Sequence, residues 1–384
     1  MTWLILTQPT FSQTATWLNA ATNSSWGTAS NWADGYIPHG VDQIADFSTV
    51  NIESNRTVNL VGNRLVGSLI FGDAETASNN WILANGAGGP WSLTLATSEG
   101  IPEIRVVNQV ATISALLAGT QGLSKTGAGT LTLSNAGNTL TGGITLQAGT
   151  LNFSQGALGE NQVTFAANAA LAWSAGNAQD ISAQLMIGEG VTATLATGAN
   201  NLVFASAMQT SSSTLASVIK TGAGSLTFTA PNVYTGNTRV NGGRIILAGG
   251  SDRLAPTSTV TLGQGTSSGV LQLGDASGAS DQTLASLVMA GTGSANAVVG
   301  GHETLSILTI ERATAVTYAG LLGGSGEYEN NLGLTKSGAG TLTLSNDGNS
   351  FVGDVIVSGG ILAITRSNAL GTSPKSITIS GTTN

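Results

Sequence analysis

The side chains that could perform acid–base chemistry are few and lie far apart in the sequence. Two groupings combine an acid or a base with a cation: Asp252 with Arg253, and His302 with Glu303, Glu311 and Arg312. Glycoside hydrolysis needs two carboxylates held together, and polysaccharide lyases need a base near a cation, so these groupings are the candidates for an enzyme site. Each is more typical of a solvated loop or strand edge. We therefore predict no catalytic residues.

Residues that could hold a metal or a phosphate form no recognisable pattern. His39 lies beside Pro38 in an aromatic segment, as expected of a surface turn, and it is far in sequence from the second histidine, His302. Calcium-binding Gly-Gly-x-Gly-x-Asp nonapeptides do not occur. Gly127 and Gly129 superficially resemble a phosphate loop, but no Gly-Lys-Ser/Thr ending or following helix accompanies them. We therefore predict no metal ligands, no cofactor-binding residues and no cofactor.

Three lysines recur at one position of an internal repeat: Lys125, Lys220 and Lys336. They could form a spaced binding row, but single lysines at turns, which discourage aggregation through sheet edges, are the more common arrangement. The repeat loops also share asparagines. We expect these to stack into hydrogen-bonded ladders where successive coils are in register: Asn135, Asn138, Asn232, Asn346 and Asn349.

Composition indicates a folded, strand-rich chain. The 384 residues include 53 Gly, 41% hydrophobic residues and only 8% charged residues. This is too apolar for a disordered linker, and the abundant Thr, Ser, Asn, Leu and Val favour strands and turns. A net charge of −8 and scattered Lys and Arg argue against a nucleic-acid partner. No apolar run reaches the ~18 to 20 residues of a membrane-spanning helix, so membrane association would need a further domain.

The repeat itself predicts the architecture. Segments that start at Lys125, Lys220 and Lys336 each read Lys-x-Gly-Ala-Gly and continue with apolar residues that alternate with Thr, as in a strand with one buried face. A second strand follows a loop rich in Asn, Gly and Ser. The second segment is one residue shorter in this loop, whereas its strands keep their spacing.

Glycine marks the corner before the third strand of each segment, at Gly149, Gly243 or Gly360. Such a sharp change of direction suits glycine, which tolerates positive φ. Separate β-sandwiches would need regular antiparallel hairpins with Asn-Gly turns. Short corners and coil-length repetition favour an all-β fold, a parallel β-helix in which each repeat is one to two coils long.

The ends of the chain differ from its middle. Six of the seven Trp lie at or before Trp91, so we expect residues 16–100 to form an aromatic-rich amino-terminal cap. Trp26 and Trp32 could present flat faces to a sugar, but paired Trp in a cap more often fill a small core. Residues 1–15 are interpreted as the remnant of a truncated signal peptide, with an ordinary first strand as the alternative. Residues 101–384 are expected to be solenoid repeats, in an array that continues beyond residue 384.

Residues 334–346 (Leu-Thr-Lys-Ser-Gly-Ala-Gly-Thr-Leu-Thr-Leu-Ser-Asn) and the nearly identical residues 123–135 closely resemble the autotransporter-associated β-strand repeat. Clear units lie near 123–153, 218–247 and 334–364, and the second departs by having Val218 and Ile219 before its lysine. The resemblance implies the passenger region of an autotransporter-type protein. It further implies a right-handed β-helix, secreted to or displayed on the outer membrane of a Gram-negative bacterium.

From these observations we expect a structural and adhesive stalk segment, not an enzyme, whose partners are surface glycans or proteins. Two alternatives remain open. One is a carbohydrate-active β-helix enzyme, a polysaccharide lyase or hydrolase, because stacked coils can bring distant carboxylates together. The other is a self-assembling surface-layer component, which would associate end to end.

Overall fold

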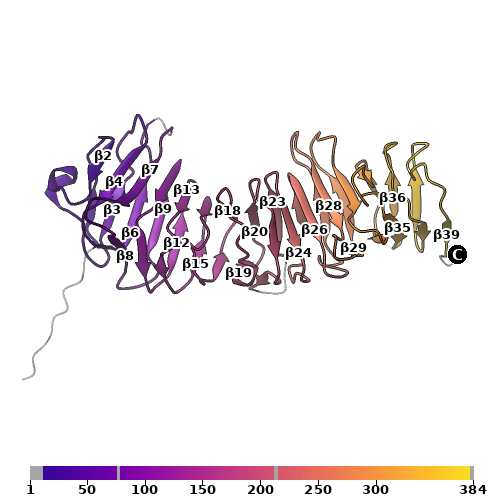
Figure 1. The fold of residues 1–384 in the computed structure, drawn as a ribbon, viewed down its shortest axis with the longest axis horizontal. Helices are drawn as coiled ribbons and strands as arrows, with labels where there is room; N and C mark the ends of the chain where they lie inside the picture. Colours follow the sequence, from indigo (N-terminus) through magenta and orange to yellow (C-terminus); the bar gives the residue numbers. More distant parts are fainter. Residues whose placement is uncertain (1–11, 76–77, 212–214, 381–384) are drawn as a thin grey trace, which may run out of the picture. The chain divides into compact units, whose positions relative to one another are not determined.

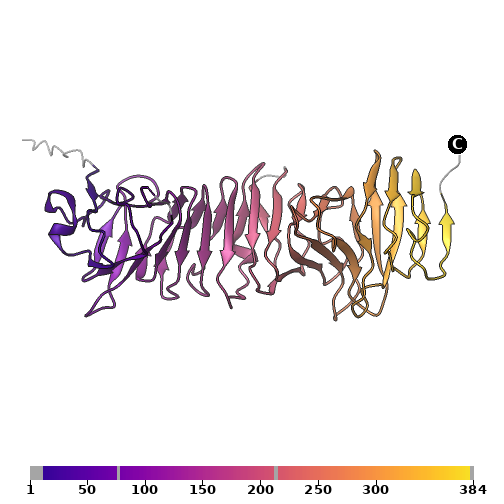
Figure 2. The ribbon, with the colours of Figure 1, turned by 90° about the horizontal axis from the view of Figure 1, so that it is seen from above.

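Parallel strands dominate the structure, a computed structural model that describes residues 12–75, 78–211 and 215–380. The chain divides into two compact units, Met1–Thr164 and Phe165–Asn384. In each unit, strands from successive turns of the chain lie side by side (Figures 1 and 2), and they pair in parallel. Each unit is thus a β-solenoid, which confirms the predicted all-β parallel β-helix.

The first unit contains three sheets. One sheet has the order β1 (Thr14–Thr16), β3 (Ile44–Phe47), β6 (Ser68–Phe71), β9 (Glu103–Val106), β12 (Leu123–Thr126) and β15 (Ile144–Leu146). The second has the order β2 (Asn23–Ser25), β4 (Arg56–Leu60), β7 (Trp81–Asn85), β10 (Val110–Ile113), β13 (Thr130–Leu133) and β16 (Thr150–Phe153). The third has the order β14 (Thr139–Leu140), β11 (Leu116–Gly119), β8 (Ser92–Leu95) and β5 (Arg64–Val66). Two 3-10 turns, η1 (Ala29–Asn31) and η2 (Ala33–Gly35), lie between β2 and β3.

The second unit repeats this plan. One sheet runs through β18 (Ala169–Trp173), β20 (Thr192–Ala196), β23 (Ser217–Thr221), β25 (Thr238–Val240), β27 (Thr259–Leu262) and β30 (Ser286–Met289). Another runs through β21 (Leu202–Phe204), β24 (Ser225–Phe228), β26 (Gly243–Leu247), β28 (Gly269–Leu273), β31 (Ala297–Gly300) and β34 (Leu321–Leu322).

Shorter sheets complete the second unit. One contains β29 (Gln282–Leu284), β32 (Ser306–Glu311), β35 (Leu332–Ser337), β37 (Val355–Val357) and β39 (Ile377–Ile379), and another contains β33 (Val316–Tyr318), β36 (Thr341–Leu344) and β38 (Ile361–Ile364). Strands β19 (Leu185–Ile187) and β22 (Gln209–Thr210) pair with each other, and η3 (Ser182–Gln184) precedes β19. Strand β17 (Val163–Phe165) lies at the boundary between the units.

The number of residues in one turn of the solenoid varies, chiefly through the length of the corners. Leu123 pairs with Ile144, 21 residues later, whereas Ser68 pairs with Glu103, 35 residues later. The repeat motif therefore marks short turns of the solenoid. Its three strands, at the positions that the alternation predicts, are confirmed in each repeat.

The core is a set of inward-facing columns. Side chains alternate between the interior and solvent, and residues at matching positions of successive turns stack on one another. One such column in the first unit is buried throughout: Val58, Leu83, Ile113, Leu133 and Phe153. Each such side chain contributes about 1.5–3 kcal/mol through burial, so the columns are the main source of stability.

An aromatic cluster lies at the start of the first unit. Its members are all buried: Trp17, Trp26, Trp32, Phe47, Phe71 and Trp81. Phe47 stacks on Phe71 at a centroid distance of 5.1 Å and lies 5.5 Å from Trp81. Residues 16–100 contribute solenoid strands of their own, and their role as a cap stays a prediction. The predicted signal-peptide remnant, residues 1–15, lies mostly outside the described residues.

Candidate functional site

Lys125 occupies an inward-facing position in a core column, not a turn. It lies on β12 in register with Ile104 of the preceding turn and Leu146 of the following turn. Its side chain is completely buried. The predictions of an exposed binding row and of exposed turn lysines are therefore both wrong for this residue.

The ammonium group of Lys125 is enclosed by backbone carbonyls at the corner of the solenoid. Its Nζ donates hydrogen bonds to the carbonyl oxygens of Thr126 at 2.8 Å and Gly127 at 2.9 Å, both in its own turn. A third bond, of 3.1 Å, reaches the carbonyl of Ala148 in the next turn. The lysine therefore ties two successive turns together. We call this arrangement the lysine corner.

The same lysine corner recurs twice in the second unit. Lys220 Nζ bonds to the carbonyls of Gly222 at 2.6 Å, of Gly224, and of Gly242 in the next turn at 2.9 Å. Both side chains, Lys220 and Lys336, are completely buried.

Lys336 repeats the pattern with its own corner. Its Nζ bonds to the carbonyls of Ser337, of Gly338 at 2.7 Å, and of Gly359 in the next turn at 3.2 Å. All three ammonium groups thus bond to two carbonyls of their own turn and one of the next, although Lys220 uses Gly222 and Gly224 where the other two lysines use the first and second residues after them. This shared role explains why the lysine recurs in the motif.

Burial affects the charge state of these lysines. It lowers the pKa of Lys125 and Lys220 to about 8, and it also lowers the pKa of Lys336. At neutral pH the ammonium form still predominates in the first two. An ammonium has three N–H donors, which match the three carbonyl acceptors of each corner. Satisfying every donor is what makes a buried cation tolerable.

The corner glycine that follows the second strand is required by two constraints. Gly149, Gly243 and Gly360 have φ values of +65°, +63° and +65°, which favour glycine. A Cβ on Gly243 would lie 2.3 Å from the Gly224 oxygen and 2.5 Å from Lys220 Nζ. The glycine therefore lets the backbone of one turn approach the corner below it closely enough for the lysine to reach both.

An asparagine in each repeat also connects successive turns. The amide of Asn138 accepts a hydrogen bond from Leu117 N at 2.9 Å and donates to Ala157 O at 3.0 Å. Asn232 and Asn349 make equivalent bonds to the backbone on both sides.

The other two asparagines of the predicted ladders also bond to backbone. Asn135 Nδ2 donates to Ser114 O at 3.0 Å, and Asn346 Nδ2 donates to Ala319 O at 2.8 Å. The expected ladders of asparagine side chains are thus replaced by amide-to-backbone bridges, because the backbone of the adjacent turn lies within reach.

Comparison with protein families assigns these segments. A family model described as the passenger-associated-transport-repeat matches residues 123–153, 218–247 and 334–364. Three segments of this β-solenoid thus match the passenger-associated-transport-repeat. Each match contains one lysine corner and at least one bridging asparagine. No curated protein and no solved structure matches the chain significantly.

The passenger-associated-transport-repeat carries a broader implication. It is consistent with an autotransporter passenger with β-strand repeats, as the resemblance indicated. The family implies a protein that is secreted or displayed on a surface. The structure adds a physical account of the repeat's lysine, glycines and asparagine, all of which hold neighbouring turns together.

The candidate acid–base group at Asp252 and Arg253 is divided between separate structural contacts. Asp252 Oδ1 accepts a hydrogen bond from Thr283 N at 2.8 Å. Arg253 donates instead to the carbonyls of Gly250 at 3.1 Å and Thr229 at 3.3 Å. The two side chains thus stabilise different parts of the backbone, and no joint acid–base geometry results.

The second candidate group is also dispersed. His302 Nδ1 accepts a hydrogen bond from Thr304 N at 3.0 Å, and the neighbouring Glu303 side chain is exposed. Arg312 Nε donates to Thr314 O at 3.2 Å, while Glu311 is exposed at the end of β32. These contacts are typical of loop and strand-edge residues.

The remaining candidates also have structural contacts. His39 is exposed, and its Nδ1 accepts a bond from Leu65 N at 3.2 Å. Among the described residues, no group of three or more His, Cys, Asp or Glu is placed to hold a metal ion. Across that same part of the chain, no helix has the length and apolar character needed to cross a membrane.

Trp26 and Trp32 lie in the core and not on a sugar-binding face. They are 0% and 1% exposed, and their ring centroids are 5.1 Å apart. Trp32 Nε1 donates to Trp26 O at 2.8 Å, which satisfies the polar group of its indole. A glycan contact through these two side chains is therefore ruled out, in favour of the alternative that they fill a small core.

Proposed function

We propose that this protein is a stalk segment of an autotransporter-type passenger, displayed on the outside of a Gram-negative cell, with a structural and adhesive role. Support comes from the three passenger-associated-transport-repeats and from the solenoid fold of both units. The observation that carries the proposal is the lysine corner. The most reactive side chain of the repeat is buried among backbone carbonyls, so the repeat serves to stack turns and not to contact a substrate.

The shape of the purified chain in solution tests the proposal that it forms a stalk. A globular chain of 384 residues would have a radius of gyration of about 21 Å. A stalk predicts a clearly larger value in small-angle X-ray scattering of the purified chain. A value close to that of a globule would contradict the proposal.

Surface display is tested separately, by labelling cells of the source organism with an antibody against this chain. Intact cells, or their culture medium, should give the signal. Labelling that appears only after lysis would contradict export. A cytosolic protein of the same cells, labelled in parallel, reports on leakage.

A further inference from the structure

The second lysine corner differs from the other two in a residue that faces the next turn's bond. In each corner, the residue just before the carbonyl that accepts the third bond of the lysine donates its own backbone N–H to the carbonyl of that lysine, at 2.9 Å. This residue is Gln147 in the first repeat, Asn241 in the second and Ser358 in the third. Of the three corners, only the second therefore has an asparagine followed directly by glycine, Gly242.

An Asn-Gly pair carries the groups for a spontaneous modification. The backbone nitrogen of the glycine loses its proton to hydroxide and attacks the side-chain carbon Cγ of the asparagine. The Cγ–Nδ2 bond breaks and ammonia leaves, which closes a five-membered succinimide. Water then opens this ring to aspartate or to isoaspartate, in which the main chain runs through the former side chain. Glycine favours the attack because it has no Cβ to hinder the approach of its nitrogen.

The reacting groups of Asn241 and Gly242 are only weakly restrained. Among the hydrogen bonds of the described residues, none is donated by the Gly242 N–H. A Cβ on Gly242 would have no atom nearer than 3.4 Å, so this backbone has room to move. The side chain of Asn241 is held by a bond from its Nδ2 to Gln264 Oε1, and no donor in the described part of the chain serves its Oδ1. The nucleophile is therefore free, and one exposed bond restrains the amide.

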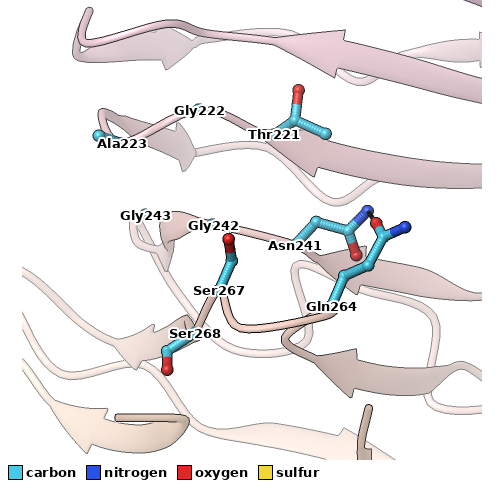
Figure 3. A pocket seen from close by; sticks show the side chains of 9 residues that line it. All are labelled: Thr221, Gly222, Ala223, Asn241, Gly242, Gly243, Gln264, Ser267 and Ser268. Carbon is cyan, nitrogen blue, oxygen red and sulfur yellow. Dashed lines mark hydrogen bonds between the residues drawn. The ribbon is translucent and has the colours of Figure 1, made fainter. Parts of the chain in front are cut away.

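A hollow of about 530 Å³ opens this corner to water. Asn241 and Gly242 line it, and Figure 3 shows the amides of Asn241 and Gln264 facing each other across it. The hollow results from a difference in corner length. Only residues 241–242 separate β25 from β26, whereas residues 263–268 separate β27 from β28 in the next turn. The short corner is thus recessed beside a longer one, with space for water to enter and for ammonia to leave.

The chain has one other Asn-Gly pair, Asn85-Gly86, and there the same groups are engaged. The Gly86 N–H donates to Leu60 O at 2.7 Å, and a Cβ on Gly86 would lie 2.7 Å from that same oxygen. Asn85 Oδ1 accepts a bond of 2.9 Å from Trp91 N. Both hydrogen bonds must break before the nitrogen can attack. The fold therefore protects this pair and leaves the pair in the second lysine corner exposed to reaction.

We propose that Asn241-Gly242 is a self-modification site, at which conversion to isoaspartate opens the second lysine corner. Isoaspartate adds one carbon to the main chain just before Gly242. This displaces the Gly242 carbonyl, which accepts from Lys220 Nζ at 2.9 Å, so the lysine loses its bond to the next turn. The other corners are spared, because serine cannot form the ring and glutamine would have to close a larger one. The inference concerns the lifetime of the solenoid and is independent of the stalk and its adhesive role.

Peptide mapping by mass spectrometry tests the proposal on the purified chain, incubated at neutral pH in water enriched in heavy oxygen, which marks each new carboxylate. Asn241 should gain the label at least about 10-fold faster than Asn85, because reaction at Asn85 requires two hydrogen bonds to break first. In the chemically denatured chain the two rates should become similar. An equal or faster rate at Asn85 in the folded chain, or no label at Asn241 while the denatured chain reacts, would overturn the proposal.

The effect on the corner is tested with Asn241→Ser, which introduces the residue that the third corner has at this position. Parent and variant are aged in parallel, and the unfolding midpoint of each is compared with that of its own fresh sample. The parent should lose stability with age and the variant should keep it. Asn85→Ser is the matched control and should age like the parent. Equal losses in the parent and in Asn241→Ser would show that the modification does not open the corner.

Discussion

The aromatic cluster of the first unit and the lysine corners both hold successive turns of a solenoid in register, but they do so through different interactions. The cluster does so through apolar contact, with Phe47 within 5.6 Å of the Trp26 ring and 5.3 Å of the Trp17 ring. The corner does so through three directed hydrogen bonds from one buried ammonium.

The two arrangements differ in how well they tolerate substitution of a side chain. An aromatic contact of this kind is largely non-directional, so a smaller apolar side chain keeps part of it. A lysine corner needs a cation, three carbonyls and a close backbone approach together, and it fails when any one is lost. Strict sequence recurrence is therefore expected at the corner and not at the cluster, and the repeat shows this pattern in three copies.

The largest effect is expected from Phe47→Ala, which removes the ring at the centre of the cluster. We expect a loss of about 3–5 kcal/mol in the unfolding free energy of the first unit, measured by denaturant titration followed by Trp fluorescence. Phe47→Leu should cost less than half as much, because part of the contact remains. Equal losses in the two variants would mean that the cluster depends on ring geometry and is no more tolerant than the corner.

Gly243→Ala comes next, with an expected loss of about 2–4 kcal/mol. A positive φ alone costs about 1–2 kcal/mol for alanine, and the added Cβ would lie 2.3 Å from a backbone oxygen. Gly265→Ala isolates the first contribution, since Gly265 has a φ of +56° and nothing within 4 Å of its Cβ position. If both variants lose the same stability, close approach is not what the corner requires.

Lys125→Met should cost about 2–3 kcal/mol. Methionine keeps most of the volume of the side chain but leaves three buried carbonyls without their donor. Arg105→Met removes an exposed positive charge from β9, the strand paired with β12, and should change stability by less than about 0.5 kcal/mol. Similar values for the two variants would show that the lysine contributes only its charge.

The smallest effect is expected from pH. Burial lowers the pKa of Lys220 in the folded chain to about 8, from the ordinary lysine value of 10.5. Between these values the unfolded chain binds more protons than the folded chain, so the contribution of Lys220 to stability rises with pH. The stability of the parent chain relative to Lys220→Met should increase by about 1–2 kcal/mol from pH 7 to 9.5. A constant difference would place the folded pKa near its ordinary value.

Much of this fold follows from local pattern. Alternating Leu and Thr located the strands, and the glycines located the corners. The burial of Lys125 could also be predicted from the sequence, because Lys125 follows Leu123 by two residues and period-two alternation places both side chains on one face. The prediction of a turn residue relied on the usual exposure of lysine and did not take this alternation into account.

The carbonyl partners of the lysines could not be predicted in the same way. They depend on the direction of individual peptide groups at a corner and on a second corner, more than twenty residues away, that must lie directly above. The hollow beside the second lysine corner (Figure 3), which Gly242, Gln264 and Ser267 help to line, is equally non-local. It arises from the contrast between the corners at 241–242 and 263–268, and either length alone carries no signal.

The third bond of each lysine has an evolutionary consequence. Lys125, Lys220 and Lys336 each depend on a carbonyl in the next turn, at Ala148, Gly242 and Gly359. The smallest segment that can be duplicated without breaking a corner is therefore not one turn but a turn together with the corner of its successor. A change of length between these two points leaves the corner intact where it falls in the Asn-rich loop, as the shorter second copy illustrates. A gene for such a protein can grow by copying these units whole, while the lengths of their loops vary around the bridging asparagine.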